Sequence, residues 1–188
     1  MKILNRLEEW IIASLMAGAT FIIFIAVLHR YLSGLPIPGL QDWLIAQNTS
    51  WAQELSTFMF VWMAKFGAAY GVRTGIHVGV DVLINRLSDR WRKKLIVVAL
   101  MAGALFTGII GTLGASFVLR MAGTDQTSAD MEIPMWIVYM ALPLGSYLMC
   151  FRFLQVTWTF VRTGALPKHD HAYVEGLDDE IEEGKKAP

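Results

Sequence analysis

Residues 10–31 read WIIASLMAGATFIIFIAVLHRY, an apolar run that meets its first charged residue at Arg30. A helix needs about 20 such residues to cross the hydrocarbon core of a bilayer. Three later runs are also long enough, and they cover approximately residues 51–72, 95–119 and 134–161. None of the four has the strict alternation of a barrel strand, and lipid accepts only helices or closed barrels. The sequence therefore predicts an all-α membrane protein with four transmembrane helices.

The composition of the whole chain points the same way. Of its 188 residues 55% are hydrophobic and 17% are charged, whereas soluble domains carry about 25% charged residues. The formal net charge of zero gives no reason to expect a nucleic-acid partner. A single cysteine, Cys150, predicts neither an internal disulfide nor a zinc site. A cleaved signal peptide is an alternative for the first run, but Glu8 and Glu9 interrupt the basic segment that it would need.

Lysine and arginine gather on one side of the four predicted spans. They precede the first span, occupy the connector of residues 73–94, and follow the fourth span. These residues are Lys2, Arg6, Arg73, Arg86, Arg90, Arg92, Lys93, Lys94, Arg162, Lys168, Lys185 and Lys186. The opposite side carries only Arg30 and Arg120. Because Lys and Arg are concentrated in cytoplasmic segments, we predict that both termini are cytoplasmic.

The transmembrane domain is predicted to cover residues 1–166, and residues 167–188 to form an acidic, disordered cytoplasmic tail. The tail contains His169 and His171, but no further ligand is spaced to join them, so no metal site is expected. In the connector, apolar residues up to Trp91 recur at helical spacing. This pattern predicts a short amphipathic helix on the membrane surface, with its arginines toward lipid phosphates.

Two positive charges are predicted to lie inside the membrane, Lys65 in the second span and Arg152 in the fourth. A charge at the bilayer centre costs about 2.5–3.5 kcal/mol on insertion scales. Lys65 precedes Arg73 by eight residues, which places it about 12 Å inside the cytoplasmic end of its helix. No acid is evident at a matching depth for either cation. Lys65 either snorkels toward the surface or, with Arg152, faces a partner subunit or a lipid phosphate, and we predict the second.

Small residues recur at intervals that allow helices to approach closely in lipid. One stripe is Gly67, Gly71 and Gly75, and the other is Gly103, Thr107, Gly111 and Ala115. The neighbouring helix belongs either to this chain or to a second protein. Gly67 and Gly71 are therefore candidates for a subunit or lipid interface, and so is Trp91, which belongs to the apolar pattern of the connector.

Two loops are predicted on the side opposite the termini. In the first, SGLPIPGLQDWLIAQNTS (33–50), helical spacing from Leu40 to Gln47 predicts a short surface helix that carries Trp43. The second loop contains three acidic residues, which are Asp125, Asp130 and Glu132. In the last span, Pro134 suits a first helical turn and Pro143 predicts a kink.

Residues 71–87, GVRTGIHVGVDVLINRL, resemble the R-x-G-x-H-V-x-V-D signature of small membrane subunits of tripartite ATP-independent periplasmic (TRAP) transporters, the DctQ family. The motif positions are occupied by Arg73, Gly75, His77, Val78, Val80 and Asp81. Further matches are Glu54, Trp62, Gly67, Pro134, Tyr139, Pro143, Gly145 and Arg152. The resemblance covers roughly residues 8–162, and the amino-acid sequence of residues 62–86 is most similar to that of C4-dicarboxylate members.

The resemblance implies a bacterial inner-membrane protein that is not an enzyme and has no cofactor. In this family a periplasmic protein captures an organic acid, and a large membrane subunit moves it together with sodium. The small subunit braces the large one and offers a docking surface. The implied partners are therefore the large transport subunit, the periplasmic substrate-binding protein and membrane lipids. The resemblance implies a structural role for Arg73, Gly75, His77 and Asp81, and it makes Trp43, Asp125, Asp130 and Glu132 candidates for docking.

Two other classes of function are open. A haem-binding anchor of a respiratory enzyme needs paired histidines, but His29 and His77 are predicted on opposite sides of a core about 30 Å thick. A Soret band in the purified protein would favour that class. A self-sufficient small multidrug transporter would use Glu54 as its proton site, yet Glu54 is predicted at the wet edge of its helix, where a carboxylate is stabilised. Transport by this chain alone in liposomes would favour that class.

Overall fold

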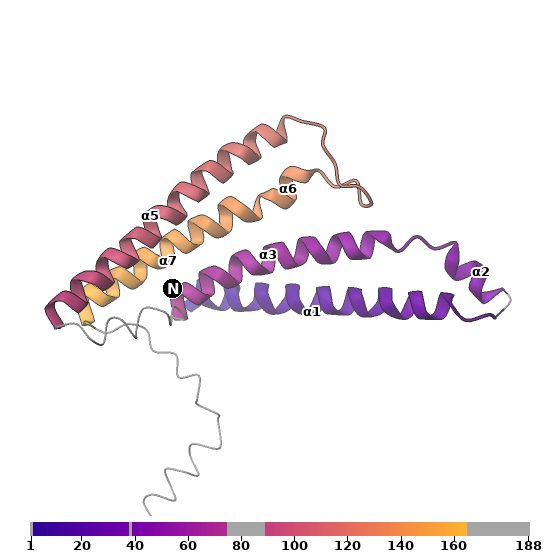
Figure 1. Ribbon diagram of the computed structural model, residues 1–188, viewed down its shortest axis with the longest axis horizontal. Coiled ribbons are helices and arrows are strands. Elements are labelled where there is room, and N and C mark those ends of the chain that lie inside the picture. The colour runs from indigo at the N-terminus through magenta and orange to yellow at the C-terminus, as the bar shows by residue number, and fades with distance from the viewer. Residues whose placement is uncertain (1, 38, 75–88, 165–188) are drawn as a thin grey trace, which may run out of the picture.

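The computed structural model describes residues 2–37, 39–74 and 89–164, and this part of the chain is helical apart from its loops. The helices are α1 (Lys2–Ser33), α2 (Leu40–Ile45), α3 (Ser50–Thr74), α5 (Asp89–Ala122), α6 (Met135–Tyr139) and α7 (Ala141–Thr163) (Figure 1). The described ranges therefore confirm the all-α class.

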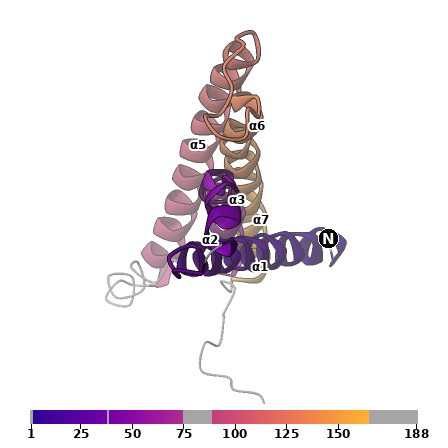
Figure 2. The ribbon, with the colours of Figure 1, turned by 90° about the vertical axis from the view of Figure 1, so that its right-hand side faces the viewer.

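The long helices form two hairpins that meet at one end of the molecule. α1 pairs with α3, α5 pairs with α7, and α3 packs against α7. The hairpins converge where α1 begins and α7 ends, which we call the junction end, and they diverge toward the loops, which we call the loop end (Figure 1). Figure 2 shows that α1 runs across the direction of α5 and α7. Among the helices, contacts between the hairpins are chiefly those of α3 with α7.

Three helical stretches of the described residues are long and apolar enough to cross a membrane. They are Asn5–Ser33 in α1, Trp91–Ala122 in α5, and Met135–Thr163, which combines α6 and α7. The 25 residues of α3 are also long enough, but Lys65 and several glycine and hydroxyl residues make that helix less apolar. The membrane character of three predicted spans is supported by composition, and α3 as a fourth span stays a prediction.

The helix of the third predicted span begins before its apolar run. That run starts near residue 95, whereas α5 begins at Asp89. The segment DRWRKK contains no glycine or proline, so the helix of the apolar run extends through it. Trp91 thus belongs to α5. The expected amphipathic helix and the tail of residues 167–188 fall largely or wholly outside the described residues.

The last predicted span is bent, as its second proline requires. α6 begins directly after Pro134 and ends at Tyr139, and α7 begins at Ala141. Because Pro143 has no N–H, it cannot donate to the carbonyl oxygen four residues earlier. The interruption at Met140 lies within one turn before Pro143, which confirms the predicted kink.

The two stripes of small residues have different surroundings. A Cβ atom added to Gly103 would lie 2.9 Å from the ring of Phe153, and one added to Gly111 would lie 2.9 Å from the ring of Tyr147. The stripe on α5 therefore packs against α7 of the same chain. A Cβ atom added to Gly67 or Gly71 of α3 would meet nothing within 4 Å among the described residues.

Candidate functional site: a charged junction of three helices

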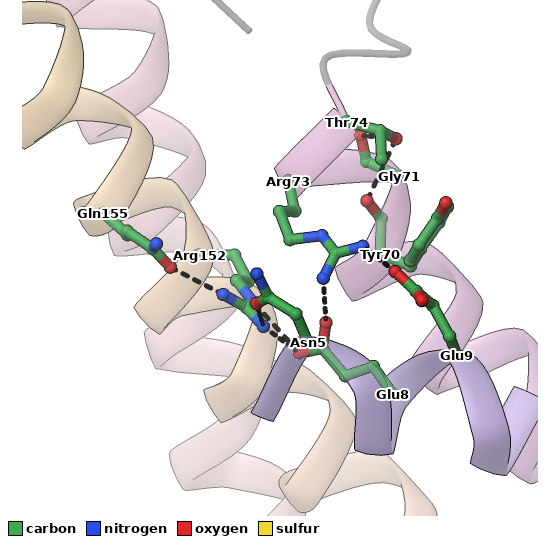
Figure 3. Close-up of polar contacts among 9 residues, drawn as sticks. All are labelled: Asn5, Glu8, Glu9, Tyr70, Gly71, Arg73, Thr74, Arg152 and Gln155. Carbon is green, nitrogen blue, oxygen red and sulfur yellow. Dashed lines mark hydrogen bonds and ion pairs between the residues drawn. The ribbon is translucent and has the colours of Figure 1, made fainter. Parts of the chain in front are cut away.

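The long helices α1, α3 and α7 meet at a cluster of polar side chains that we call the charged junction (Figure 3). α1 contributes three of its residues, α3 one and α7 two. They are Asn5, Glu8, Glu9, Arg73, Arg152 and Gln155. The labelled side chains of these helices point toward one another in Figure 3, so residues from both hairpins converge at one level.

Arg152 is the centre of the charged junction and is fully buried, with 0% of its surface exposed. Its Nη2 atom lies 2.7 Å from Oε1 of Glu8, and its Nε atom donates a hydrogen bond of 3.0 Å to the same oxygen. Nη2 also donates to Oδ1 of Asn5 at 2.8 Å, and Nη1 donates to Oε1 of Gln155 at 2.7 Å. All three guanidinium nitrogens therefore have acceptors inside the chain.

The expectation that Arg152 has no acid at its depth is wrong. Glu8, which is 2% exposed, supplies that acid. The sequence interpretation placed Glu8 in the flank before a span that started at residue 10, but α1 already begins at Lys2. Glu8 is consequently well inside the helix and level with Arg152. A buried cation is tolerated when an acid and further acceptors surround it, so Arg152 is not free to face a partner subunit or lipid in this arrangement.

Arg73 links the end of α3 to the same part of α1. Its Nη2 atom donates to Oε1 of Glu9 at 2.5 Å, and its guanidinium lies 4.7 Å from the centroid of the Tyr70 ring. Its Nη1 atom lies 3.8 Å from Oε2 of Glu8, too far for a hydrogen bond. Nη1 of Arg73 and Oε2 of Glu8 are both buried and have no hydrogen-bond partner among the described residues. Glu8 thus stands between two arginines that come from different hairpins.

The charged junction contains two acids and two arginines, so its charges balance. Each acid is held by an arginine, which leaves no carboxylate poised to accept a substrate proton. Within the described ranges, no three His, Cys, Asp or Glu side chains are grouped to hold a metal ion. The side chains of the charged junction hold α1, α3 and α7 together at one level of the bundle. Their role is therefore structural and not catalytic.

A second polar contact joins the hairpins at the loop end. Oε1 of Glu54, near the start of α3, accepts a hydrogen bond of 3.1 Å from the backbone N–H of Ala129. Oε2 accepts from the N–H groups of Asp130 and Met131 at 3.0 and 2.9 Å. The three donors are consecutive, so one carboxylate fixes the turn of the second loop. These hydrogen bonds give Glu54 a structural role, which the multidrug-transporter hypothesis did not include.

The candidate docking residues all lie at the loop end. The predicted surface helix exists as α2, where Leu44 is buried and Trp43 is exposed. A ring nitrogen of His29, Nε2, lies 3.0 Å from the Leu44 carbonyl oxygen, which ties α2 to α1. The acidic candidates of the second loop are exposed; they are Asp125, Asp130 and Glu132.

The remaining predicted site residues are scattered. Lys65 is half-buried, and its Cβ atom lies against Gly145 of α7. Trp91 is exposed at the start of α5, and the ammonium of Lys94 lies 5.5 Å from its ring centroid. Of the connector motif, only Arg73 lies within the described residues. The other five positions fall outside them, and they are Gly75, His77, Val78, Val80 and Asp81.

Sequence reasoning missed Asn5, Glu8 and Gln155. One signal was available, because an arginine inside an apolar span requires an acid somewhere at its depth. Gln155 also follows Arg152 by three residues, a spacing that brings side chains together on a helix. The partner on α1 is found only by assembling the helices.

Comparison with known proteins identifies the chain. Residues 19–163 match the model of a family described as tripartite ATP-independent periplasmic transporters, DctQ component. The chain belongs to this family. The DctQ resemblance noted in the sequence is therefore confirmed, and the charged junction and the Glu54 contact are features of a TRAP transporter small subunit, which is not an enzyme.

Two relatives of similar length strengthen the assignment. The C4-dicarboxylate TRAP transporter small permease protein DctQ of Rhodobacter capsulatus is 54% identical, over 97% of this chain and 88% of the relative. The protein with the same name from Vibrio cholerae is 31% identical, over 87% of this chain and 75% of the relative.

A longer relative has a different organisation. The isethionate TRAP transporter permease protein DctMQ of Oleidesulfovibrio alaskensis is 23% identical over 80% of this chain, but the match covers only 23% of that protein. A counterpart of the DctQ chain is therefore one part of a larger permease polypeptide there, which agrees with the pairing of TRAP small subunits with a large permease.

Proposed function

We propose that this chain is the small permease subunit of a C4-dicarboxylate TRAP transporter in a bacterial inner membrane. The observation that carries the substrate class is the 54% identity to a C4-dicarboxylate small permease over nearly the whole chain. A sialic acid TRAP small permease from Vibrio cholerae is only 25% identical, so the C4-dicarboxylate assignment is favoured. Transport coupled to sodium belongs to the large permease in this proposal.

The mechanical role proposed for the chain is to brace that permease. Its support is the charged junction, because buried ion pairs among α1, α3 and α7 hold the two hairpins in a fixed relation. The excess of Lys and Arg near both termini supports placing the junction end at the cytoplasmic face. α3 is then the fourth span, and the loop end faces the periplasm.

The loop end is proposed to help dock the substrate-binding protein. Trp43 on α2 and the exposed acids Asp125, Asp130 and Glu132 support this role, because both loops present side chains away from the bundle. Glu54 would act indirectly, by holding the turn that carries Asp130. Anchoring of Trp43 and Trp51 in the lipid interface is the alternative role for the first loop.

The connector motif is proposed to shape the cytoplasmic face. Arg73 supports this idea, since it joins the last turn of α3 to Glu9 of α1 just before the motif continues. Replacing His77 or Asp81 by Ala is expected to lower assembly or uptake without changing substrate preference. Unaltered assembly and uptake would count against the proposal, as would a changed preference.

The function is tested by deleting the chain from a strain that carries the large permease and the binding protein, and measuring uptake of radiolabelled succinate. Uptake is expected to fall to background and to return when the chain is supplied from a plasmid. Unlabelled C4-dicarboxylates should compete with succinate, whereas sialic acid should not. Uptake that persists without the chain, or that sialic acid inhibits, would refute the proposal.

A further inference from the structure

Lys65 lies on the edge of α3 that meets α7. The two helices approach so closely there that a Cβ atom added to Gly145 would lie 2.6 Å from the Cβ of Lys65. One turn before and after, on the same face of α3, Val61 and Ala68 are exposed. The base of the Lys65 side chain is therefore fixed, while the face beside it is left uncovered by the described residues.

The acids of the described chain do not neutralise Lys65. The ion pairs of the described residues join Arg73 and Arg152 to Glu8 and Glu9, and none of these pairs includes Lys65. Glu54 precedes Lys65 by eleven residues on α3 and already accepts three backbone hydrogen bonds from the second loop. The ammonium consequently has no acidic partner among the described residues.

The depth of Lys65 makes this unusual. At 1.5 Å per residue, the eight residues to Arg73 put Lys65 about 12 Å deeper than the charged junction. An ionised side chain at such a depth normally faces another charge or a water-filled cavity. Arg152, the other cation of the spans, meets that requirement within the chain through Glu8. The four methylene groups of Lys65 cover only part of the distance to a cytoplasmic headgroup.

We propose that Lys65 forms an ion pair with an Asp or Glu on a membrane helix of the large permease, which packs along the Val61–Ala68 face of α3. The inference rests on the proposed function, because it needs that permease as the partner. Charge complementarity selects a carboxylate, and the exposed neighbours of Lys65 provide room for a helix. The ion pair would stabilise the assembled complex and would fix the depth in the membrane at which the two subunits contact each other.

The test uses the assembled transporter, with an affinity tag on this chain. The amount of permease retained is measured as detergent concentration rises. Lys65→Met removes the charge at similar length and is expected to lower retention about tenfold, because it leaves the permease carboxylate unpaired. Lys65→Arg keeps the charge and should retain most of the permease. Lys93→Met is the matched control, since Lys93 is an exposed lysine at the start of α5.

A membrane-permeant carbodiimide provides a second measurement, because it joins an amine to an adjacent carboxylate. Mass spectrometry of the unmodified complex is expected to find Lys65 linked to an Asp or Glu of a permease membrane segment. The link should be absent from Lys65→Met. If that variant does not reach the membrane, this link decides the question: a permease carboxylate supports the ion pair, and its absence overturns it.

Several results would overturn the inference. One is a Lys65→Met chain that reaches the membrane normally and retains as much permease as the parent. Another is unchanged retention combined with weaker binding of anionic lipid by the isolated subunit, which would make a lipid phosphate the partner. If permease fails to co-purify even with the unmodified chain, the proposed function itself is wrong, so the two failures are distinguishable.

Discussion

Arg152 of α7 and Glu8 of α1 are separated by 144 residues in the chain, yet their charged atoms lie 2.7 Å apart in the buried charged junction. The contact joins the first helix to the last, and Arg73 brings α3 to the same carboxylate from the other side. For a subunit whose proposed role is to brace a moving partner, such a contact resists separation of the two hairpins at one end.

Removing one member of this pair should destabilise the subunit strongly. Arg152→Met leaves the Glu8 carboxylate buried without its main partner, and we expect the free energy of unfolding to fall by about 3–5 kcal/mol. Thermal unfolding in detergent measures the effect. Glu9→Gln is the control, because Glu9 is 50% exposed and a pair at such a position is worth at most about 1 kcal/mol. If the double variant with Glu8→Gln and Arg152→Met loses as much stability as the two single variants together, the two residues are not coupled.

The approach of α3 to α7 should depend on the absence of a side chain at Gly145. Its added Cβ atom would also lie 3.3 Å from the backbone carbonyl of Lys65, which cannot move aside as a flexible side chain can. Gly145→Ala is expected to cost about 1–3 kcal/mol of stability by overpacking. The new Cβ atom of Gly71→Ala would meet nothing within 4 Å among the described residues, so this variant should be neutral, or stabilising by about 0.5–1 kcal/mol. Equal unfolding temperatures for the two variants would contradict this assignment of the helix contact.

The turn of the second loop should loosen when its carboxylate anchor is removed. Glu54→Ala takes away the acceptor for three consecutive N–H groups, those of Ala129, Asp130 and Met131. Their amide hydrogens are expected to exchange with solvent several-fold faster, as hydrogen–deuterium exchange mass spectrometry can measure. Asp130→Asn changes an exposed side chain in the same turn and should leave the exchange rates alone. Equal exchange rates in the two variants would mean that the turn is stable without the Glu54 carboxylate.

Docking at the loop end should respond to charge. Asp130→Lys combined with Glu132→Lys is expected to reduce uptake several-fold when the binding protein is limiting, because opposite charges across an interface raise the association rate. Excess binding protein should restore uptake, since only the encounter is weakened. Uptake that stays low at saturating binding protein would show a defect other than docking.

Much of the fold follows from local features of the sequence. The long apolar runs predicted the principal helices, the spacing from Leu40 to Gln47 predicted α2, and Pro143 predicted the break between α6 and α7. The motif around Arg73 was sufficient to indicate the DctQ family, which the comparisons confirm. These features work because helix formation and membrane insertion depend on residues that are neighbours in the chain.

The contacts that hold the bundle together depend on the rotation and depth of every helix. The partner of Arg152 was assigned incorrectly from the sequence because Glu8 stood outside the expected first span. Small residues recur every four positions in both stripes, yet Gly103 packs against α7, whereas a Cβ atom added to Gly71 would meet nothing within 4 Å among the described residues.

The sequence by itself thus determined which of the described segments are helical, where the last span bends and which family the chain belongs to. Only the tertiary structure decided that Glu8 neutralises Arg152 and that Glu54 fastens the second loop. The physical reason is that hydropathy and periodicity act over one helix, whereas an ion pair between helices requires two side chains to share a depth and a facing direction. Those two quantities are set when all the helices pack together.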